Sequence, residues 1–301
     1  MTFAFHVSLW RHYECGGTRV KTPACLGSKG YIVKLRTRSI VSSALLLLAF
    51  ASGAAHSQST RLPFSSTFEG GNFSEWDGFR NTTGVTIESS GCQSGRCARA
   101  PLVTGTTSDN YGDFYFGDHV SSGGSKVEEV WLSFYSKFDS GITWPNRSQK
   151  LAIINLTDGV SSERRYQVYA YVRPNGEYAV DKSDIATWTF TGLYQNVGGA
   201  ATSVRLGQWD KLKLYVKLNT PNQANGIVRL WVNGTLKVDY ANVDIRAGTS
   251  MGLNKLILSS YATQGSGSAG VQWWDSFKLQ ATDPDAGTAV LPNPPTNVRA
   301  E

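Results

Sequence analysis

The stretch that decides the fold is Trp209–Leu218, which reads WDKLKLYVKL. Its apolar side chains alternate with three lysines and a tyrosine, so that one face of an extended strand is apolar. This alternation predicts a half-buried β-strand, because successive strand side chains point to opposite faces. The segment Val130–Phe138 (VWLSFYSKF) has the same design. The residues that we expect to face inward are Val130, Leu132, Phe134, Phe138, Leu212, Leu214, Val216 and Leu218.

Turn signals separate further segments of this kind. Asn-Gly pairs at Asn175-Gly176 and Asn233-Gly234 predict two β-hairpins. Gly270–Leu279 reads as a closing strand, and no long amphipathic helix stands out. The pattern predicts an all-β sandwich or barrel. We expect one domain over residues 60–282, followed by a proline-rich linker or tail over 283–301.

The net charge of +6 is uninformative about binding partners. Residues 1–57 hold seven of the 29 basic residues and one of the 23 acidic residues, which leaves 22 of each in the rest of the chain. The sequence pI of about 9.1 therefore does not indicate a nucleic-acid-binding protein. A preference for anionic ligands has to come from a local patch.

Residues 1–57 read as a leader with a secretory signal peptide. The basic segment Lys34–Arg38 precedes the apolar run Ile40–Ala51, which is short for a membrane span, and small residues follow it. A membrane anchor is the alternative. Residues 1–33 fit poorly before a signal and suggest an over-extended start. We expect a secreted or periplasmic protein that has no membrane contact after cleavage.

Two cysteines, Cys92 and Cys97, follow this leader in the sequence CQSGRC. A close pair in an exported chain predicts a disulfide across a short loop. The alternative is a two-thiol metal site. Since His119 is the one histidine beyond residue 57, the ligands for structural zinc are too few.

The segment around Asn175-Gly176 offers a candidate binding face. If Asn175-Gly176 is a two-residue loop, Arg173 lies opposite Tyr178, and directly opposed residues share a face of the sheet. Small and medium residues (Tyr166, Val168, Ala170, Val172 and Ala179) then face the core. The other face gathers Arg165, Gln167, Tyr169, Tyr171, Arg173, Tyr178 and Lys182.

Phenol rings, cations and amides are the groups that a groove for an acidic polysaccharide needs. The alternative is an ordinary solvated sheet face. Trp131, Tyr135 and Lys137 have the same character on the outer face of Val130–Phe138, which favours the groove. The paired carboxylates of sandwich glycosidases and the motifs GxSxG, HExxH and the P-loop do not occur. Chemistry with tyrosine and lysine is thus favoured over hydrolysis with two carboxylates.

The sequence contains, in this order, the segments FEGGNFSEW, VWLSFYSKF, QKLAIINL, YVRPNGEY, WDKLKLYVKLNTP and WWDSFKL. Together they resemble a polysaccharide lyase with a concanavalin A-like jelly roll. The resemblance spans residues 64–280 and is to alginate and glucuronan lyases, above all to polysaccharide lyase family 14. It implies a jelly-roll β-sandwich and cleavage of a uronic-acid glycan by β-elimination.

The resemblance also implies site residues. Lys150 stands where the family has a lysine, and Arg173–Gly176 matches its R-x-N-G turn. Tyr178 matches the first residue of a Tyr-x-Tyr pair, but Val180 replaces the second. Gln167 and Tyr169 stand in place of a Ser-x-Arg pair. We expect Lys150 as base or charge neutraliser, Tyr178 or Tyr169 as acid/base, and Arg173 and Gln167 as carboxylate binders.

Many jelly rolls tie their first and last strands together with a structural Ca²⁺. Glu69 and Asp275 stand where such ligands would lie, although polar residues without a metal are the alternative. No cofactor is required for catalysis. We expect an acidic polysaccharide as partner, no nucleic acid and a monomer. The alternative function is a non-catalytic, lectin-like carbohydrate-binding domain, and a structural or adhesive exported domain is a third.

Overall fold

The computed structural model describes residues 60–81, 83–102, 110–144, 148–158, 164–197, 202–261 and 269–286, without the side chains of residues 164 and 165. The leader, residues 1–57, and positions 287–301 lie outside these ranges. The chain divides after Ala54, and every described residue belongs to the unit Ala55–Glu301. Within the described ranges there is no α-helix, and hence no helix long and apolar enough to cross a membrane.

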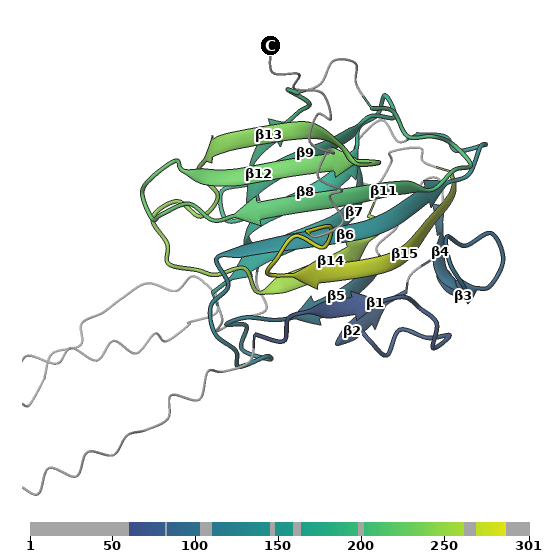
Figure 1. Cartoon of the computed structure of the whole chain (residues 1–301), viewed down its shortest axis with the longest axis horizontal. Coiled ribbons are helices and arrows are strands. Elements are labelled where there is room, and N and C mark those ends of the chain that lie inside the picture. The colour runs from purple at the N-terminus through teal and green to yellow at the C-terminus, as the bar shows by residue number, and fades with distance from the viewer. Residues whose placement is uncertain are drawn as a thin grey trace, which may run out of the picture. The chain divides into compact units, whose positions relative to one another are not determined.

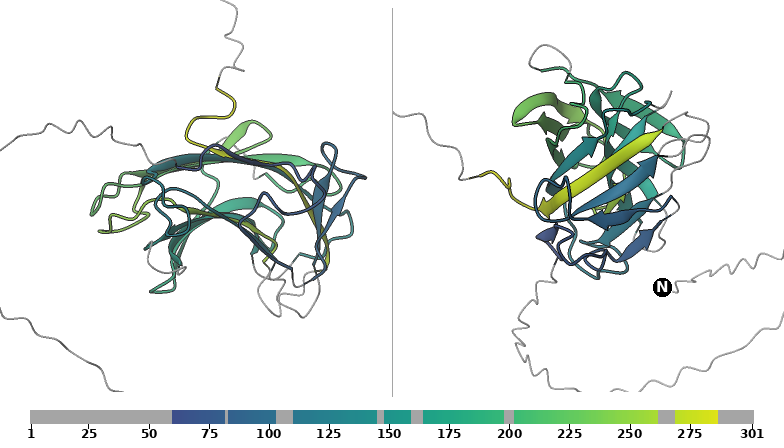
Figure 2. Two further views of the ribbon diagram at one scale, coloured as in Figure 1. Left: turned by 90° about the horizontal axis from the view of Figure 1, so that it is seen from below. Right: turned by 90° about the vertical axis from the view of Figure 1, so that its right-hand side faces the viewer.

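Two antiparallel sheets pack face to face, as the all-β expectation required (Figure 1). The first sheet has the order β13 (Thr235–Val243), β12 (Gly226–Val232), β11 (Asp210–Lys217), β6 (Glu129–Phe138), β15 (Gly270–Gln280), β4 (Cys97–Leu102) and β3 (Thr86–Glu88), and β1 (Phe64–Ser66) also pairs with β15. The second sheet has the order β10 (Thr189–Leu193), β9 (Tyr178–Asp184), β8 (Arg164–Val172), β7 (Gln149–Thr157), β14 (Lys255–Ser259), β5 (Tyr111–Tyr115) and β2 (Gly78–Arg80). Both sheets curve in the same sense, so the outer face of the second sheet is concave (Figure 2).

The core lies between the sheets. The apolar faces predicted for β6 and β11 are confirmed, since all eight inward residues named for these segments are buried. Phe277 of β15 stacks on Phe134 of β6 with ring centroids 4.9 Å apart. Burial of this apolar surface is the main force that holds the two sheets together.

The two Asn-Gly hairpins differ in loop length. Asn233-Gly234 forms a two-residue loop between the paired residues Val232 and Thr235, as predicted, and both loop residues have positive φ. The other loop has three residues, Pro174 to Gly176, because Arg173 N–H bonds Glu177 O (2.8 Å) and Gly176 N–H bonds Arg173 O (2.9 Å). A two-residue loop would need a backbone N–H donor at Pro174, which proline lacks.

The register predicted for β8 and β9 is therefore wrong by one residue. Val172 pairs with Tyr178, and Tyr169 pairs with Asp181. A shift by one residue moves every side chain of β9 to the opposite face of the sheet. Tyr178 and Lys182 thus leave the outer face, and Ala179, predicted to lie in the core, faces outward with Tyr169 and Tyr171.

The predicted Cys92–Cys97 disulfide is present. Glu69 and Asp275, the proposed calcium ligands, meet at this loop, where they accept bonds from backbone amides. Arg96 N donates to Glu69 Oε1 (2.9 Å) and Ser94 N to Asp275 Oδ2 (3.0 Å). No group of three or more His, Cys, Asp or Glu side chains suited to a metal occurs within the described ranges. The two carboxylates anchor the disulfide loop to β15 and to the turn after β1.

Candidate active site

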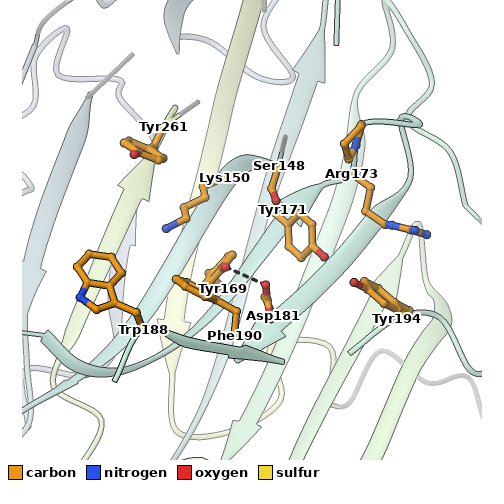
Figure 3. Close-up of a pocket in the computed structure, with 11 residues that line it drawn as sticks. Ser148, Lys150, Tyr169, Tyr171, Arg173, Asp181, Trp188, Phe190, Tyr194 and Tyr261 are labelled. Carbon is orange, nitrogen blue, oxygen red and sulfur yellow. Dashed lines mark hydrogen bonds between the residues drawn. The ribbon is translucent and has the colours of Figure 1, made fainter. Parts of the chain in front are cut away.

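A groove of about 640 Å³ opens on the concave face of the second sheet (Figure 3). Its floor comes from neighbouring strands, because the register sets Lys150 of β7 beside Tyr171 of β8, and Tyr169 of β8 beside Asp181 of β9. The residues that line it are Ser148, Lys150, Tyr169, Tyr171, Arg173, Pro174, Asp181, Trp188, Phe190, Tyr194 and Tyr261.

Lys150 lies on this face because of a β-bulge. Ile153 faces the groove side, so strict alternation along β7 would direct residue 150 into the core. The register shifts between Lys150 and Ala152, and Leu151, the extra residue, is buried in the core. One extra residue reverses the facing of all that precede it, which restores Lys150 to the groove.

Lys150, Tyr169 and Asp181 form the centre of the groove. Lys150 Nζ lies 4.5 Å from the centroid of the Tyr169 ring, and the Tyr169 hydroxyl donates to Asp181 Oδ2 at 2.9 Å. Burial, followed by the charge and hydrogen bond of Asp181, raises the pKa of Tyr169 far above its ordinary value. The phenol is therefore neutral at physiological pH.

Asp181 combines burial with an unsatisfied oxygen. Its exposed fraction is 9%, and its Oδ1 has no hydrogen-bond partner. Burial raises the pKa of Asp181 above the ordinary value for aspartate, although the hydrogen bond from Tyr169 and the charge of Lys150 oppose the shift. A carboxylate in this environment accepts a proton more readily than an exposed one.

Tyr171, Arg173 and Tyr194 form one end of the groove. The guanidinium carbon of Arg173 lies 4.6 Å from the centroid of the Tyr194 ring, and Arg173 Nη1 pairs with Glu177 Oε2 at 2.8 Å. Burial, together with the charge of Asp181, raises the pKa of Tyr171 well above its ordinary value. Arginine stays charged at any physiological pH, so this end has a permanent cation suited to a carboxylate.

Aromatic side chains on β10 and at its two ends form the rim. Trp188 exposes 71% of its surface, Phe190 50% and Tyr194 47%. Large apolar side chains are rarely left this open, and aromatic faces are suited to stacking on sugar rings. Across the groove, the Tyr261 ring lies 5.2 Å from Lys150 Nζ and stacks near Tyr111 at 6.3 Å.

A second hollow of about 350 Å³ continues along the same face over β14, β5 and β2. Lys255 Nζ pairs there with Asp113 Oδ2 at 2.9 Å and lies 5.1 Å from the Tyr115 ring centroid. Ile257 of this hollow pairs with Ile153, and Ile153 pairs with Tyr169 of the groove, so the two hollows are neighbours on the sheet. The concave face thus offers a path longer than a single sugar unit.

Several residues predicted for the site lie elsewhere. Tyr178 lies between the sheets, where burial raises its pKa and its hydroxyl donates to Asp210 Oδ2 at 2.9 Å. Lys182 shares that inner side of β9, because it pairs with Val168. Gln167 is on the concave side but fully buried, and the Arg165 side chain is not described. Trp131, Tyr135 and Lys137 lie on the outer face of the first sheet, so they line no common groove with Lys150.

The groove also contains residues that the sequence analysis missed, chiefly Asp181, Trp188, Phe190, Tyr194 and Tyr261. Asp181 could have been found from Pro174. Proline cannot close a two-residue loop, and a three-residue loop gives the register that sets Asp181 beside Tyr169. The alternation of Trp188 and Phe190 around Thr189 marks two side chains on one side of a strand. Tyr261 follows β14 and carries no signal of its own.

Comparisons with known proteins agree with this arrangement. The sequence model of the family Polysaccharide lyase 14 matches residues 162–272, a span that begins after Lys150. An endo-β-1,4-glucuronan lyase from the fungus Trichoderma reesei superposes with a TM-score of 0.53 at 14% identity, over 73% of this chain and 95% of that one. The marine PL-14 alginate lyase from Aplysia kurodai gives 0.53 at 14% identity, over 73% and 98%. Alginate lyase Aly36B gives 0.52 at 12% identity, over 75% and 96%.

A search of curated proteins finds no match to this chain. At identities this low, the structural neighbours show the jelly-roll fold, and the predicted fold and family resemblance are confirmed.

Proposed function

We propose that this chain is a polysaccharide lyase that binds a uronic-acid glycan along the concave face and cleaves it by β-elimination. The observation that carries the proposal is the centre of the groove, where Lys150 lies over the ring of Tyr169 and the Tyr169 hydroxyl is bonded to Asp181. A cation, a neutral phenol and a buried carboxylate are sufficient for this reaction. The family match over residues 162–272 supports the same reaction class.

Lys150 and Arg173 neutralise uronate carboxylates in this mechanism. The reaction removes the proton on C5, next to the carboxyl group, and negative charge then spreads onto the carboxylate. Fixed cations lower the energy of that charge most strongly in a site from which water is partly excluded. Lys150 at the centre of the groove neutralises the carboxylate of the reacting unit, and Arg173 at one end binds a carboxylate of the same chain.

Tyr169 and Asp181 move the proton. Tyr169 accepts the C5 proton while its own hydroxyl proton passes to Asp181 Oδ2, 2.9 Å away, so no free phenolate forms. The C5–H bond breaks, a double bond forms between C4 and C5, and the C4–O4 bond breaks. The pair then returns the proton to O4 of the leaving chain and ends in its starting state.

The aromatic rim gives the substrate its position. Exposed rings at Trp188, Phe190 and Tyr194 stack on sugar faces, and the second hollow near Lys255 accepts further units of the polymer. We further propose that the mature protein acts as a monomer outside the cytoplasm. The Cys92–Cys97 disulfide and the signal-like leader support an exported protein.

A depolymerisation screen tests the proposal. The mature protein is incubated with a panel of polyuronates that includes alginate and glucuronan, and with neutral glucans as controls. A lyase produces an unsaturated uronate at each new chain end, seen as rising ultraviolet absorbance, in parallel with falling polymer length. Shortening of the polymer without that absorbance would contradict β-elimination.

One observation favours the second candidate, a carbohydrate-binding domain without activity. The outward positions on β9 are Ala179, Asp181 and Ser183, so none carries the tyrosine that the family pattern led us to expect. Saturable binding of a polyuronate with no change in its length would establish that alternative.

A further inference from the structure

The outer face of the first sheet carries a second cluster of rings and lysines, far from the groove. Trp131 of β6 packs on Tyr215 of β11 with centroids 4.3 Å apart, and on Trp231 of β12 at 5.5 Å. Lys213 Nζ lies 5.3 Å from the Trp131 ring and 4.9 Å from the Trp231 ring. We call this surface the outer platform. It comprises Trp131, Lys211, Lys213, Tyr215 and Trp231.

Two carboxylates of the chain itself form ion pairs with the lysines of the outer platform. Asp283 Oδ1 lies 3.0 Å and Asp285 Oδ2 3.1 Å from Lys213 Nζ, and Asp285 Oδ1 lies 2.9 Å from Lys211 Nζ. Both aspartates belong to the segment after β15, which leaves on the outer side of this sheet (Figure 2). The platform therefore binds carboxylates in the structure as it stands.

The contact with the lysines shifts the pKa of Asp285, and the contact with the aspartates shifts the pKa of Lys213. Hydrogen bonds from Lys211, ahead of an opposing effect of burial, lower the pKa of Asp285 below its ordinary value. Burial alone would lower the pKa of Lys213, but its bonds with Asp283 and Asp285 outweigh that effect and raise it. Lys211 and Lys213 thus bind anions as a pair, and the carboxylates of Asp283 and Asp285 are the anions bound here.

The two lysines of the outer platform repeat along one strand, and two carboxylates pair with them. Lys211 and Lys213 are two residues apart on β11, so they point to the same side about 7 Å apart. Asp283 and Asp285 match them with the same separation in sequence. A polyuronate presents a carboxylate on every sugar unit, together with ring faces that stack on indole and phenol rings.

We infer that the outer platform is a second binding site for an acidic polysaccharide, and that Asp283 and Asp285 hold its lysines until a glycan chain displaces them. The choice of ligand rests on the proposed function. Partly exposed ion pairs contribute little to stability, since solvent screens them, so a polymer with many carboxylates can replace two. Trp131 and Trp231 are half-buried beside these lysines, whereas Tyr215 is buried and packs against Trp131.

The test compares binding of sodium alginate by the full mature chain and its variants, using affinity electrophoresis at fixed ionic strength. All proteins carry Tyr169→Phe, so that the polymer stays intact. Replacing both aspartates (Asp283→Asn with Asp285→Asn) is expected to strengthen binding about tenfold, because it removes the competing carboxylates. Adding Lys211→Ala and Lys213→Ala to that variant is expected to abolish the gain.

Two results would overturn the inference. One is unchanged alginate affinity in the double aspartate variant, with a lowered melting temperature, which would make the aspartates a structural tie only. The other is an equal gain in affinity for a polynucleotide, which would show charge attraction without sugar recognition. Trp231→Ala, which keeps every charge, checks the role of the rings and is expected to weaken alginate binding about fivefold.

Failure of the proposed function is distinguishable from failure of this inference. If the wild-type protein cleaves no polyuronate while the aspartate variant still binds alginate more tightly, the lyase proposal alone fails. If the wild-type protein cleaves alginate and the aspartate variant binds it no better, the inference alone fails.

Discussion

Both outer faces of the sandwich carry a lysine beside an aromatic ring, but the two lysines have different neighbours. On the concave face, Lys150 lies 4.5 Å from the ring of Tyr169, in a groove of about 640 Å³. On the outer platform, Lys213 lies 4.9 Å from the ring of Trp231, but carboxylates of Asp283 and Asp285 cover it. Composition is therefore a poor guide to reactivity. The two lysines differ in their neighbours, which are a phenol bonded to Asp181 beside Lys150 and two carboxylates beside Lys213.

A second pair makes the contrast sharper. Tyr169 and Tyr178 each donate a hydroxyl hydrogen bond of 2.9 Å to an aspartate, Asp181 and Asp210. Tyr169 lies at the floor of the groove, whereas Tyr178 joins the two sheets inside the core. In the proposed mechanism the bond of Tyr169 transfers a proton, whereas the bond of Tyr178 stabilises the sandwich.

The largest effect is expected for Tyr169→Phe. Loss of the hydroxyl removes the acceptor of the C5 proton and the link to Asp181, so kcat is expected to fall about 10³-fold, within the range for acid–base catalysis. Substrate KM is expected to change little, because the ring stays in place. The rate of appearance of unsaturated product measures both constants, and full activity of the variant would contradict the assigned role.

Lys150→Ala comes next, with an expected loss of about 10²-fold in kcat/KM, the magnitude for one electrostatic contact to the transition state. Lys150→Arg keeps the positive charge but cannot release a proton at neutral pH. It is expected to retain more activity than the alanine variant, and equal loss in both would instead make Lys150 the base. Lys182→Ala, on the inner side of β9, is the matched control and is expected to be fully active.

Asp181→Asn is expected to reduce kcat about tenfold, because Tyr169 then has to pass its proton to water. Asp181 accepts a proton only when ionised, so wild-type activity falls as the pH drops through its pKa. Burial raises that pKa, and this acidic limb therefore lies above the pH at which an exposed aspartate titrates. The pH profile of the asparagine variant is expected to lack the limb, and an unchanged profile would remove Asp181 from the proton path.

The smallest effect on activity is expected for Tyr178→Phe. This variant is expected to keep wild-type kcat and to lower the free energy of unfolding by about 1–2 kcal/mol, since a buried hydrogen bond to Asp210 is lost. Urea denaturation measures the stability and the product assay the activity. If folded Tyr178→Phe lost as much activity as Tyr169→Phe, the result would show that Tyr178 takes part in catalysis.

Alternation of apolar and polar residues was sufficient to predict β6 and β11 and their inner faces. It also placed Tyr169, Tyr171 and Arg173 near one another, because those residues belong to one strand and its turn. Which residues join them from β9 depends on the loop length, and hence on Pro174. Asp181 was missed and Tyr178 misplaced for that single reason.

Two other features lay beyond sequence periodicity. The bulge at Leu151 turns Lys150 outward, and a bulge arises from tertiary packing rather than from a local pattern. Trp131, Tyr135 and Lys137 resemble groove residues in type, but their strand belongs to the other sheet. Sheet membership is a long-range property, so similar side chains on two strands are no evidence for a shared site.

The most direct test of the central claim is the mass of the products from a polyuronate that the protein shortens. Elimination through Tyr169 and Asp181 predicts that each new-ended oligomer from the wild type is one water lighter than the matching hydrolysis product. The rate at which these oligomers form is expected to fall about 10³-fold in Tyr169→Phe. Products that contain the added water, or equal amounts of unsaturated product from both proteins, would contradict the account.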